Sequence, residues 1–418
     1  MGYLPEIARR SATSLAVWTV LAGFTLSAVA ADCCLPPEPT FQAQASDAGS
    51  CGVSQVADGY PAQQAGQDTA STLCPASQGG DGCSNTDGCP AIKSVSHWAF
   101  WADGGGMLRS PEHSVNFAVL NPAISAPGAA PAVVVSTADL DYDFATSGTF
   151  GVACGLSDTL QVEGMYTGTV PTSNSQAARD NTPNTLGGIG NLFSPFSDFG
   201  AQTPINGLDY NKFAAIDYTS AFHSVELNLR RQVTSQPWDG AVSLLFGIRY
   251  VGLPEDLSYQ TESDITSSGA VVPNGAINNI HVAASNEMLG AQIGCLCEFW
   301  EANGWCLNVG AKAALLNNHC GETSGYVNID NGATTSYFSS QSGNHSSLAG
   351  ELNVSLSHRW SPHFTGILGY QALWLTGTAL AQDNFNTNIA FYTSLDTQLA
   401  HSTLITYNEI YVGAQLDW

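Results

Sequence analysis

The chain carries little charge, and most of that charge is negative. Only 11% of its 418 residues are Asp, Glu, Lys or Arg, against about 25% in typical soluble domains. Its 11 basic residues, three of them lysine, are outnumbered by 35 acidic ones, which gives a formal net charge of -24. So few cations exclude a protein that binds the phosphate backbone of nucleic acids.

Long apolar runs are also missing beyond the first thirty residues, so no later segment predicts a membrane-spanning helix. A membrane form of the chain would therefore cross as a β-barrel. Aromatic residues are plentiful, with 17 Phe, 9 Trp and 14 Tyr beside 42 Gly. This composition excludes a disordered acidic chain and favours β-structure.

The amino terminus predicts a secretory signal peptide over residues 1–30. Arg9 and Arg10 precede an apolar run that begins at Leu15, and Ala28-Val29-Ala30 supplies a small-x-small cleavage site. The run is shorter than the roughly 20 residues of a spanning helix. We expect the signal to be cleaved after secretion.

Residues 31–96 are rich in Gly, Pro, Ser, Gln and Asp, which predicts a largely disordered periplasmic leader without a core of its own. Six of the eleven cysteines lie in it, and none forms a C-x-x-C pair. Disulfides are the simplest use of these cysteines in an oxidising compartment, but their connectivity stays open.

From residue 97 onward, apolar and polar residues alternate in segments of about 10–15 residues, the pattern of β-strands. The predicted strands are 97–109, 138–154, 158–169, 213–231, 241–251, 281–298, 305–316, 346–359, 363–376 and 406–418. Short connections (155–157, 232–238, 299–303 and 360–362) alternate with long ones (110–137, 170–212, 252–280, 317–345 and 377–405). This alternation predicts an antiparallel up-and-down transmembrane barrel of about ten strands over 97–418, with short periplasmic turns and long outer loops. Twelve strands remain an alternative.

Two further patterns fit an outer-membrane barrel. Aromatic residues gather near the short turns and the termini, as in an interfacial girdle; they are Trp98, Trp101, Trp238, Phe299, Trp300, Trp305, Trp360, Phe364 and Trp418. The chain also ends on Tyr411-x-Gly413-x-x-Leu416-x-Trp418, which looks like the terminal-strand signal read by barrel-assembly machinery.

Four segments in sequence order resemble β-barrel porin family 7, found in planctomycete-type bacteria: 224–231, 245–257, 304–319 and 354–374. The resemblance covers about 97–418. It implies an outer-membrane barrel but no substrate.

Charged residues on the predicted inward faces are the candidate functional residues. They are Asp103, Arg109, Glu163, Glu226, Arg230, Arg249, Lys312, Glu351, Arg359 and Glu409. Asp139, Asp141 and Asp143 share one face of the predicted strand 138–154. They form a cation-attracting mouth or a calcium site with oxygen ligands, or else simply a solvated lumen wall. In a ten-stranded barrel, paired charges of both signs can fill the interior.

Cysteine spacing places Cys297 opposite Cys306 across the turn at 299–303, although the face assignments conflict. A disulfide there requires a bulge in one strand.

No hydrolase elbow or zinc motif is present, so we expect neither an enzyme nor a cofactor or metal. The favoured function is a porin-like channel for small solutes or ions in the outer membrane, with a preference for cations. Its expected partners are membrane lipid, the assembly machinery and those solutes. A non-conducting structural or adhesive surface barrel is the alternative, and a secreted soluble β-protein is a third. Oligomeric state stays open.

Removing the terminal aromatic residue tests the assembly signal. We predict that deletion of Trp418, or Trp418→Ser, lowers the amount of barrel in the outer membrane and raises periplasmic degradation. Immunoblots of cell fractions measure both, and an unchanged yield of heat-modifiable barrel would contradict the assignment.

Overall fold

The computed structural model describes residues 98–111, 113–121, 130–140, 144–180, 189–234, 241–394 and 399–418. The predicted signal peptide and leader, and with them the six leader cysteines, lie outside the described residues. Among those described, no helix is long and apolar enough to cross a membrane.

Ten antiparallel strands close into a ring, as predicted. They follow one another around the ring in chain order, and the last pairs with the first. The strands are β1 (Trp98–Pro111), β4 (Ala145–Ser157), β5 (Leu160–Thr169), β9 (His223–Thr234), β10 (Val242–Ile265), β11 (Val271–Ala302), β12 (Trp305–Asp330), β13 (Ala333–Ser361), β14 (Phe364–Thr378) and β15 (Thr403–Asp417). Closure leaves no free sheet edge within the ring.

The outer surface of the ring is apolar, and the charges point inward. Exposed side chains on the strands include Ile293 (63%), Leu315 (63%) and Val412 (64%), whereas Glu226, Arg249 and Glu409, which belong to the opposite faces, are at most 2% exposed. A water-soluble sheet has the reverse arrangement. The apolar band therefore suits lipid around the ring.

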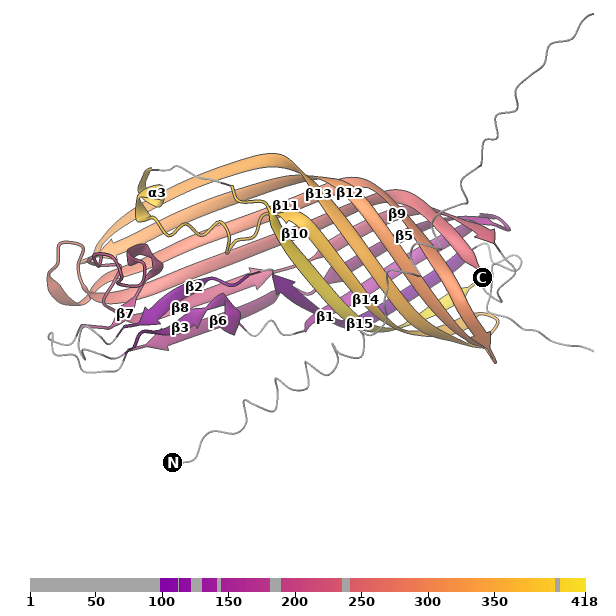
Figure 1. Ribbon diagram of the computed structural model, residues 1–418, viewed down its shortest axis with the longest axis horizontal. Coiled ribbons are helices and arrows are strands. Elements are labelled where there is room, and N and C mark those ends of the chain that lie inside the picture. Colours follow the sequence, from indigo (N-terminus) through magenta and orange to yellow (C-terminus); the bar gives the residue numbers. More distant parts are fainter. Residues whose placement is uncertain are drawn as a thin grey trace, which may run out of the picture. The chain divides into compact units, whose positions relative to one another are not determined.

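Two of the five predicted long loops are wrong, because their residues continue the strands. Residues 252–280 and 317–345 form the distal halves of β10, β11, β12 and β13, which extend well beyond the ring (Figure 1). β8 (Asn211–Ser220) pairs with distal β10, and β6 (Thr172–Arg179) pairs with β8; the short strands β2 (Asn116–Leu120), β3 (Ala132–Ser136) and β7 (Leu192–Phe193) complete this extended end. The helix α3 (Ile389–Ser394) also lies there.

Two of the predicted strands have different bounds in the structure. The segment 213–231 is two strands, β8 and β9, interrupted at Ala221 and Phe222. The segment 138–154 contributes to the ring only from Ala145, because Thr137–Asp139 forms a 3-10 turn capped by the Ser136 side chain.

Tight hairpin turns explain part of the extra length of strands β10 to β13. Asn303-Gly304 and Asn331-Gly332 both adopt positive φ angles, 53° and 81° in the first and 49° and 80° in the second. This is the backbone of the tight two-residue turn that joins twisted antiparallel strands and that Asn-Gly favours. Asn331-Gly332 thus forms a sharp hairpin in the middle of a predicted loop.

Most of the aromatic residues predicted for the turn end do lie outside the ring. Trp98, Trp305, Trp360 and Trp418 are exposed there, as are Phe299 and Phe364. Trp101 was wrongly assigned to the girdle, because its side chain lines the interior cavity. Trp238 and the side chain of Trp300 lie outside the described residues.

The hairpins make the orientation testable. We predict that epitope tags beside Asn274 or Asn331, at the extended end, are labelled on intact cells, and that a tag beside Asn303 is labelled only after the outer membrane is opened. Asn191, another loop position, is unsuitable because it is buried. Equal labelling of both sets would refute the orientation.

Candidate pore interior

The lumen near the turn end is a water-accessible cavity of about 630 Å³, here called the vestibule. Five acidic and three basic side chains line it: Asp103, Glu163, Glu298, Glu351, Asp417, Arg230, Lys312 and Arg359. Pro362 and His363, which form the turn between β13 and β14, line the same cavity. The vestibule therefore lies at the turn end of the ring.

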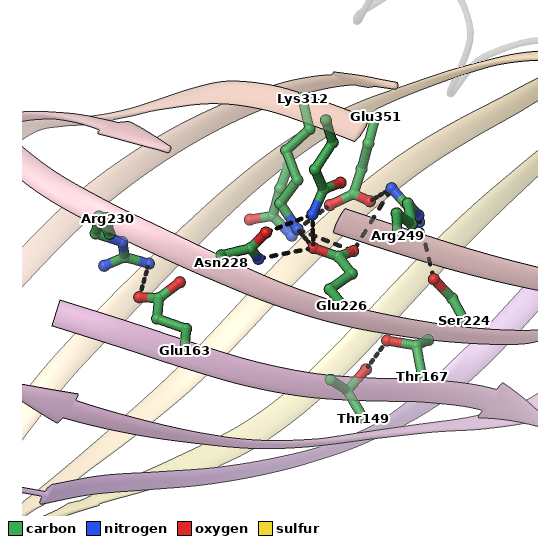
Figure 2. Close-up of polar contacts among 12 residues, drawn as sticks. Thr149, Glu163, Thr167, Ser224, Glu226, Asn228, Arg230, Arg249, Lys312 and Glu351 are labelled. Carbon is green, nitrogen blue, oxygen red and sulfur yellow. Dashed lines mark hydrogen bonds and ion pairs between the residues drawn. The ribbon is translucent and has the colours of Figure 1, made fainter. Parts of the chain in front are cut away.

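A network of buried charges adjoins the vestibule, because two of its members, Lys312 and Glu351, also line that cavity. Figure 2 shows its contacts. Glu226 on β9 and Glu351 on β13 share two cations, Arg249 on β10 and Lys312 on β12. The Lys312 Nζ lies 3.0 Å from a carboxylate oxygen of each glutamate. The Arg249 Nη1 lies 2.7 Å from Glu351 and 3.5 Å from Glu226.

Neutral side chains hold this network in place. Gln292 on β11 donates from its Nε2 to Glu226 Oε2 at 2.8 Å and to Asn228 Oδ1 at 2.5 Å. Asn228 donates to Glu226 at 3.1 Å, and Arg249 Nε donates to Ser224 Oγ at 3.2 Å. The network thus draws on five consecutive strands of the ten, half of the ring, and its polar groups bond across the lumen.

Burial makes this charge balance necessary. The side chains of Glu226, Arg249 and Glu351 are 1%, 3% and 4% exposed. A buried charge without a partner costs several kcal/mol, so two carboxylates require two cations at this place. The inward positions of these four residues are as the sequence predicted, but the participation of Gln292 and Asn228 was not foreseen.

An apolar layer lies directly beyond the network along the same strand faces. Val251 follows Arg249 by two residues, and Ala314 follows Lys312 by two, so the layer begins about 7 Å further along. Its thirteen members are Met107, Phe222, Val251, Leu253, Met288, Ala314, Leu316, Ala349, Leu373, Leu375, Leu380, Ile405 and Tyr407. All of them are buried, and they separate the vestibule from the extended end.

The segment Gly377–Phe385, here called the plug segment, completes this barrier. Leu380 belongs to the apolar layer. Asn286 holds the backbone of Ala379 through two reciprocal hydrogen bonds of 2.8 Å, and the amide of Ala381 donates to Glu255 Oε2 at 3.0 Å. Glu255 also pairs with Arg109, so Arg109 anchors the barrier from β1.

The remaining candidate charges lie elsewhere. Arg230 pairs with Glu163 at 2.8 Å on the vestibule wall (Figure 2). Glu409 is buried and accepts a hydrogen bond from Ser147, and Arg359 lines the vestibule. Asp139 was placed wrongly on a barrel strand, since it is exposed in the 3-10 turn. Asp141 and Asp143 lie outside the described residues.

The proposed cysteine pair does not form. A bulge between Glu298 and Trp300 shifts the register, so that Cys297 lies opposite Val309 and Cys306 lies opposite Glu301. Cys306 is disulfide-bonded, but not to Cys297.

The residues of the predicted assembly signal lie on both faces of the terminal strand, β15. Leu416 and Trp418 point outward, whereas Tyr411 points inward and bonds to the Asn353 side chain at 2.8 Å. Gly413 lies opposite Asp103, where a Cβ would come within 2.6 Å of the aspartate Cβ.

Comparison with known proteins decides the family. The model of the family "Putative beta barrel porin-7" matches residues 149–403, more than half of the chain. The chain belongs to this family. Together with the closed ring and its apolar outer band, membership makes it an outer-membrane β-barrel protein. No curated protein matches the sequence.

Several solved outer-membrane proteins match this porin-7 barrel at low sequence identity. The Escherichia coli outer membrane protease OmpT is 8% identical with a TM-score of 0.37, over 77% of this chain and 96% of that one. Neisserial surface protein A is 7% identical with a TM-score of 0.22, over 78% and 100%. A major outer membrane protein of Thermus thermophilus is 10% identical with a TM-score of 0.27, over 77% and 99%.

Removing one cation from the network tests its role in stability. Arg249→Ala leaves Glu226 and Glu351 with one buried cation between them, so we predict a loss of about 3–5 kcal/mol in the free energy of unfolding. Lys212→Ala breaks the more exposed pair with Asp264 in the extended end and is the control, with an expected loss below about 1 kcal/mol. Urea unfolding in detergent, followed by heat-modifiable gel mobility, measures both; equal losses would argue against the network.

Proposed function

We propose that the protein is a porin-like channel that is closed at rest. The observation that carries this proposal is the polar vestibule, which admits water from the turn end and stops at the Glu226 network. The apolar layer and the plug segment lie behind that network. Solutes would pass only when both barriers move, and we assign no catalysis to the chain.

Cation preference follows from the charges on the pathway. The vestibule is lined by five carboxylates and three cationic side chains, and the whole chain is acidic. Carboxylates that line a confined aqueous space concentrate cations and repel anions. The argument for cation preference therefore rests on the wall of the ring. It does not rest on Asp139, where the sequence suggested a cation-attracting mouth.

A non-conducting surface barrel is the second candidate, and the apolar layer favours it. Separating thirteen packed side chains would expose apolar surface at a cost of about 25 cal/mol for each Å². The extended end, held outside the ring by four continuous strands, would then be the functional part.

Planar-bilayer recording separates the two candidates. We predict that the wild-type protein shows rare, small openings, and that replacing Ala379–Phe385 by a Gly-Ser linker raises both the open probability and the conductance. In a salt gradient the reversal potential should indicate cations, and the preference should weaken as the Debye length falls from about 10 Å at 0.1 M salt to about 3 Å at 1 M.

Matched variants sharpen the result. Glu163→Gln removes a vestibule carboxylate and should lower cation selectivity, whereas Asp256→Asn, outside the ring in the extended end, should leave it unchanged. If the linker variant folds but stays silent, the barrel is non-conducting; if it prefers anions, the selectivity proposal fails.

A further inference from the structure

The distal part of β13 is an open edge of the extended sheet. β12 pairs with almost the whole of β13, but β14 pairs with it only from Ala349 onward. Further out, the Leu399 amide donates a hydrogen bond to the Gln341 side chain, so the middle of the strand still has a neighbour. Beyond that point, no strand in the described parts of the chain pairs with the second edge of residues 333–340, here called the free edge.

The free edge lacks the features that usually protect such an edge. Natural sheets protect their edges with charged side chains, proline, bulges or very short strands. Between Asp330 and Glu351 the chain has no Asp, Glu, Lys, Arg or Pro, and the ladder with β12 runs without a register shift. Because alternate residues of an antiparallel strand direct their N–H and C=O groups away from the neighbouring strand, the free edge presents a row of groups to which another strand can bond.

Side chains hold the free edge in place and leave one aromatic ring exposed. Tyr337 stacks on Tyr326, its cross-strand partner on β12, with ring centroids 6.2 Å apart, and Tyr326 belongs to the buried core of the extended end. On the opposite face, the Phe338 side chain is 64% exposed. It lies across Gly325, where a Cβ would come within 2.9 Å of the phenyl ring. A fixed strand with an exposed aromatic ring is a pre-organised contact surface.

We propose that the free edge pairs antiparallel with the free edge of a second copy of this chain. Each copy has a net charge of -24, so two copies repel one another over most of their surfaces and fit together best where charge is absent. Antiparallel pairing of 333–340 with itself keeps the side chains of one face together. It places Phe338 of one copy beside Ser336 and Phe338 of the other, which covers both rings.

The direction of the strands determines where the second copy lies. Two identical antiparallel strands are related by a two-fold axis perpendicular to them. The distal strands run from the ring toward the far end of the extended sheet (Figure 1). Copies joined at their free edges therefore point their extended ends toward each other and carry their rings at opposite ends. Such a contact joins two apposed membranes, and this inference holds whether or not the barrel conducts.

Other occupants fit the free edge less well. A basic peptide would find no carboxylate on residues 331–350, and an acidic peptide would find no cation there. A folded protein without an open strand would leave the backbone N–H and C=O groups of the edge without partners. A neutral strand that presents the same row of groups satisfies both conditions.

Clustering of proteoliposomes tests the proposal. The full-length protein is reconstituted into phosphatidylcholine vesicles of two colours, in which copies inserted in either orientation include some with the extended end outside. We expect vesicles that carry the wild-type protein to form two-colour clusters, and more of them as protein density rises, because many weak contacts act together between two membranes. Light scattering and two-colour coincidence measure the clusters, and protein-free vesicles are the blank.

Charge variants show whether the free edge meets its own copy. Ser336→Glu and Ser336→Lys each bring like charges together across the two-fold axis, and each should lower the clustered fraction about 10-fold. Mixing Glu vesicles with Lys vesicles should restore two-colour clusters, since opposite charges then meet. Ser285→Glu adds the same charge on the exposed face of β11, away from the free edge, and should change nothing. Heat-modifiable mobility confirms that each variant is folded.

Four outcomes would overturn the assignment. Three are dispersed wild-type vesicles, wild-type clustering by folded Ser336→Glu protein, and no recovery in the mixture of Glu and Lys vesicles. The fourth is binding of a free peptide of alternating Thr and Val to the wild-type protein while the vesicles stay dispersed, which would assign the edge to a foreign strand.

Discussion

The interior of the barrel depends on one set of ion pairs, in which Glu226 and Glu351 share Arg249 and Lys312. A ring that turns its apolar side chains toward lipid has only polar side chains left to fill its centre. In a narrow lumen those groups lose most of their water, so they must satisfy one another. The two glutamates and two cations do this with no net charge, and Gln292 and Asn228 occupy the remaining hydrogen-bonding positions.

This balance also divides the lumen. On the turn side of the network the wall stays wet and acidic, while on the other side Val251, Ala314 and Ala349 begin a packed apolar layer. The plug segment joins the apolar layer to the Arg109–Glu255 pair, because Leu380 packs in the layer and the Ala381 amide donates to Glu255. The barrier across the lumen is thus formed by several strands together.

The strand count and the inward faces could be predicted from sequence because alternation has a period of two and is local. Glu226, Arg249, Lys312 and Glu351 could all be assigned inward in this way. Their mutual contacts could not, since these depend on the register around a closed ring. The extended hairpins were missed because their distal halves are polar on the outer face, although Asn331-Gly332 was a readable turn signal. Trp101 was misplaced because its inward position depends on Gly151, a residue about fifty positions away that leaves room for the indole.

The continuous strands β10 to β13 carry a mechanical consequence. Each runs without interruption from the turn end into the extended end, over 24 to 32 residues. A pull on the extended end along the strands would load the hydrogen bonds of these ladders in shear, many at once, and would not open them one by one. The ring and the extended end would therefore respond to tension as one stiff body anchored in lipid.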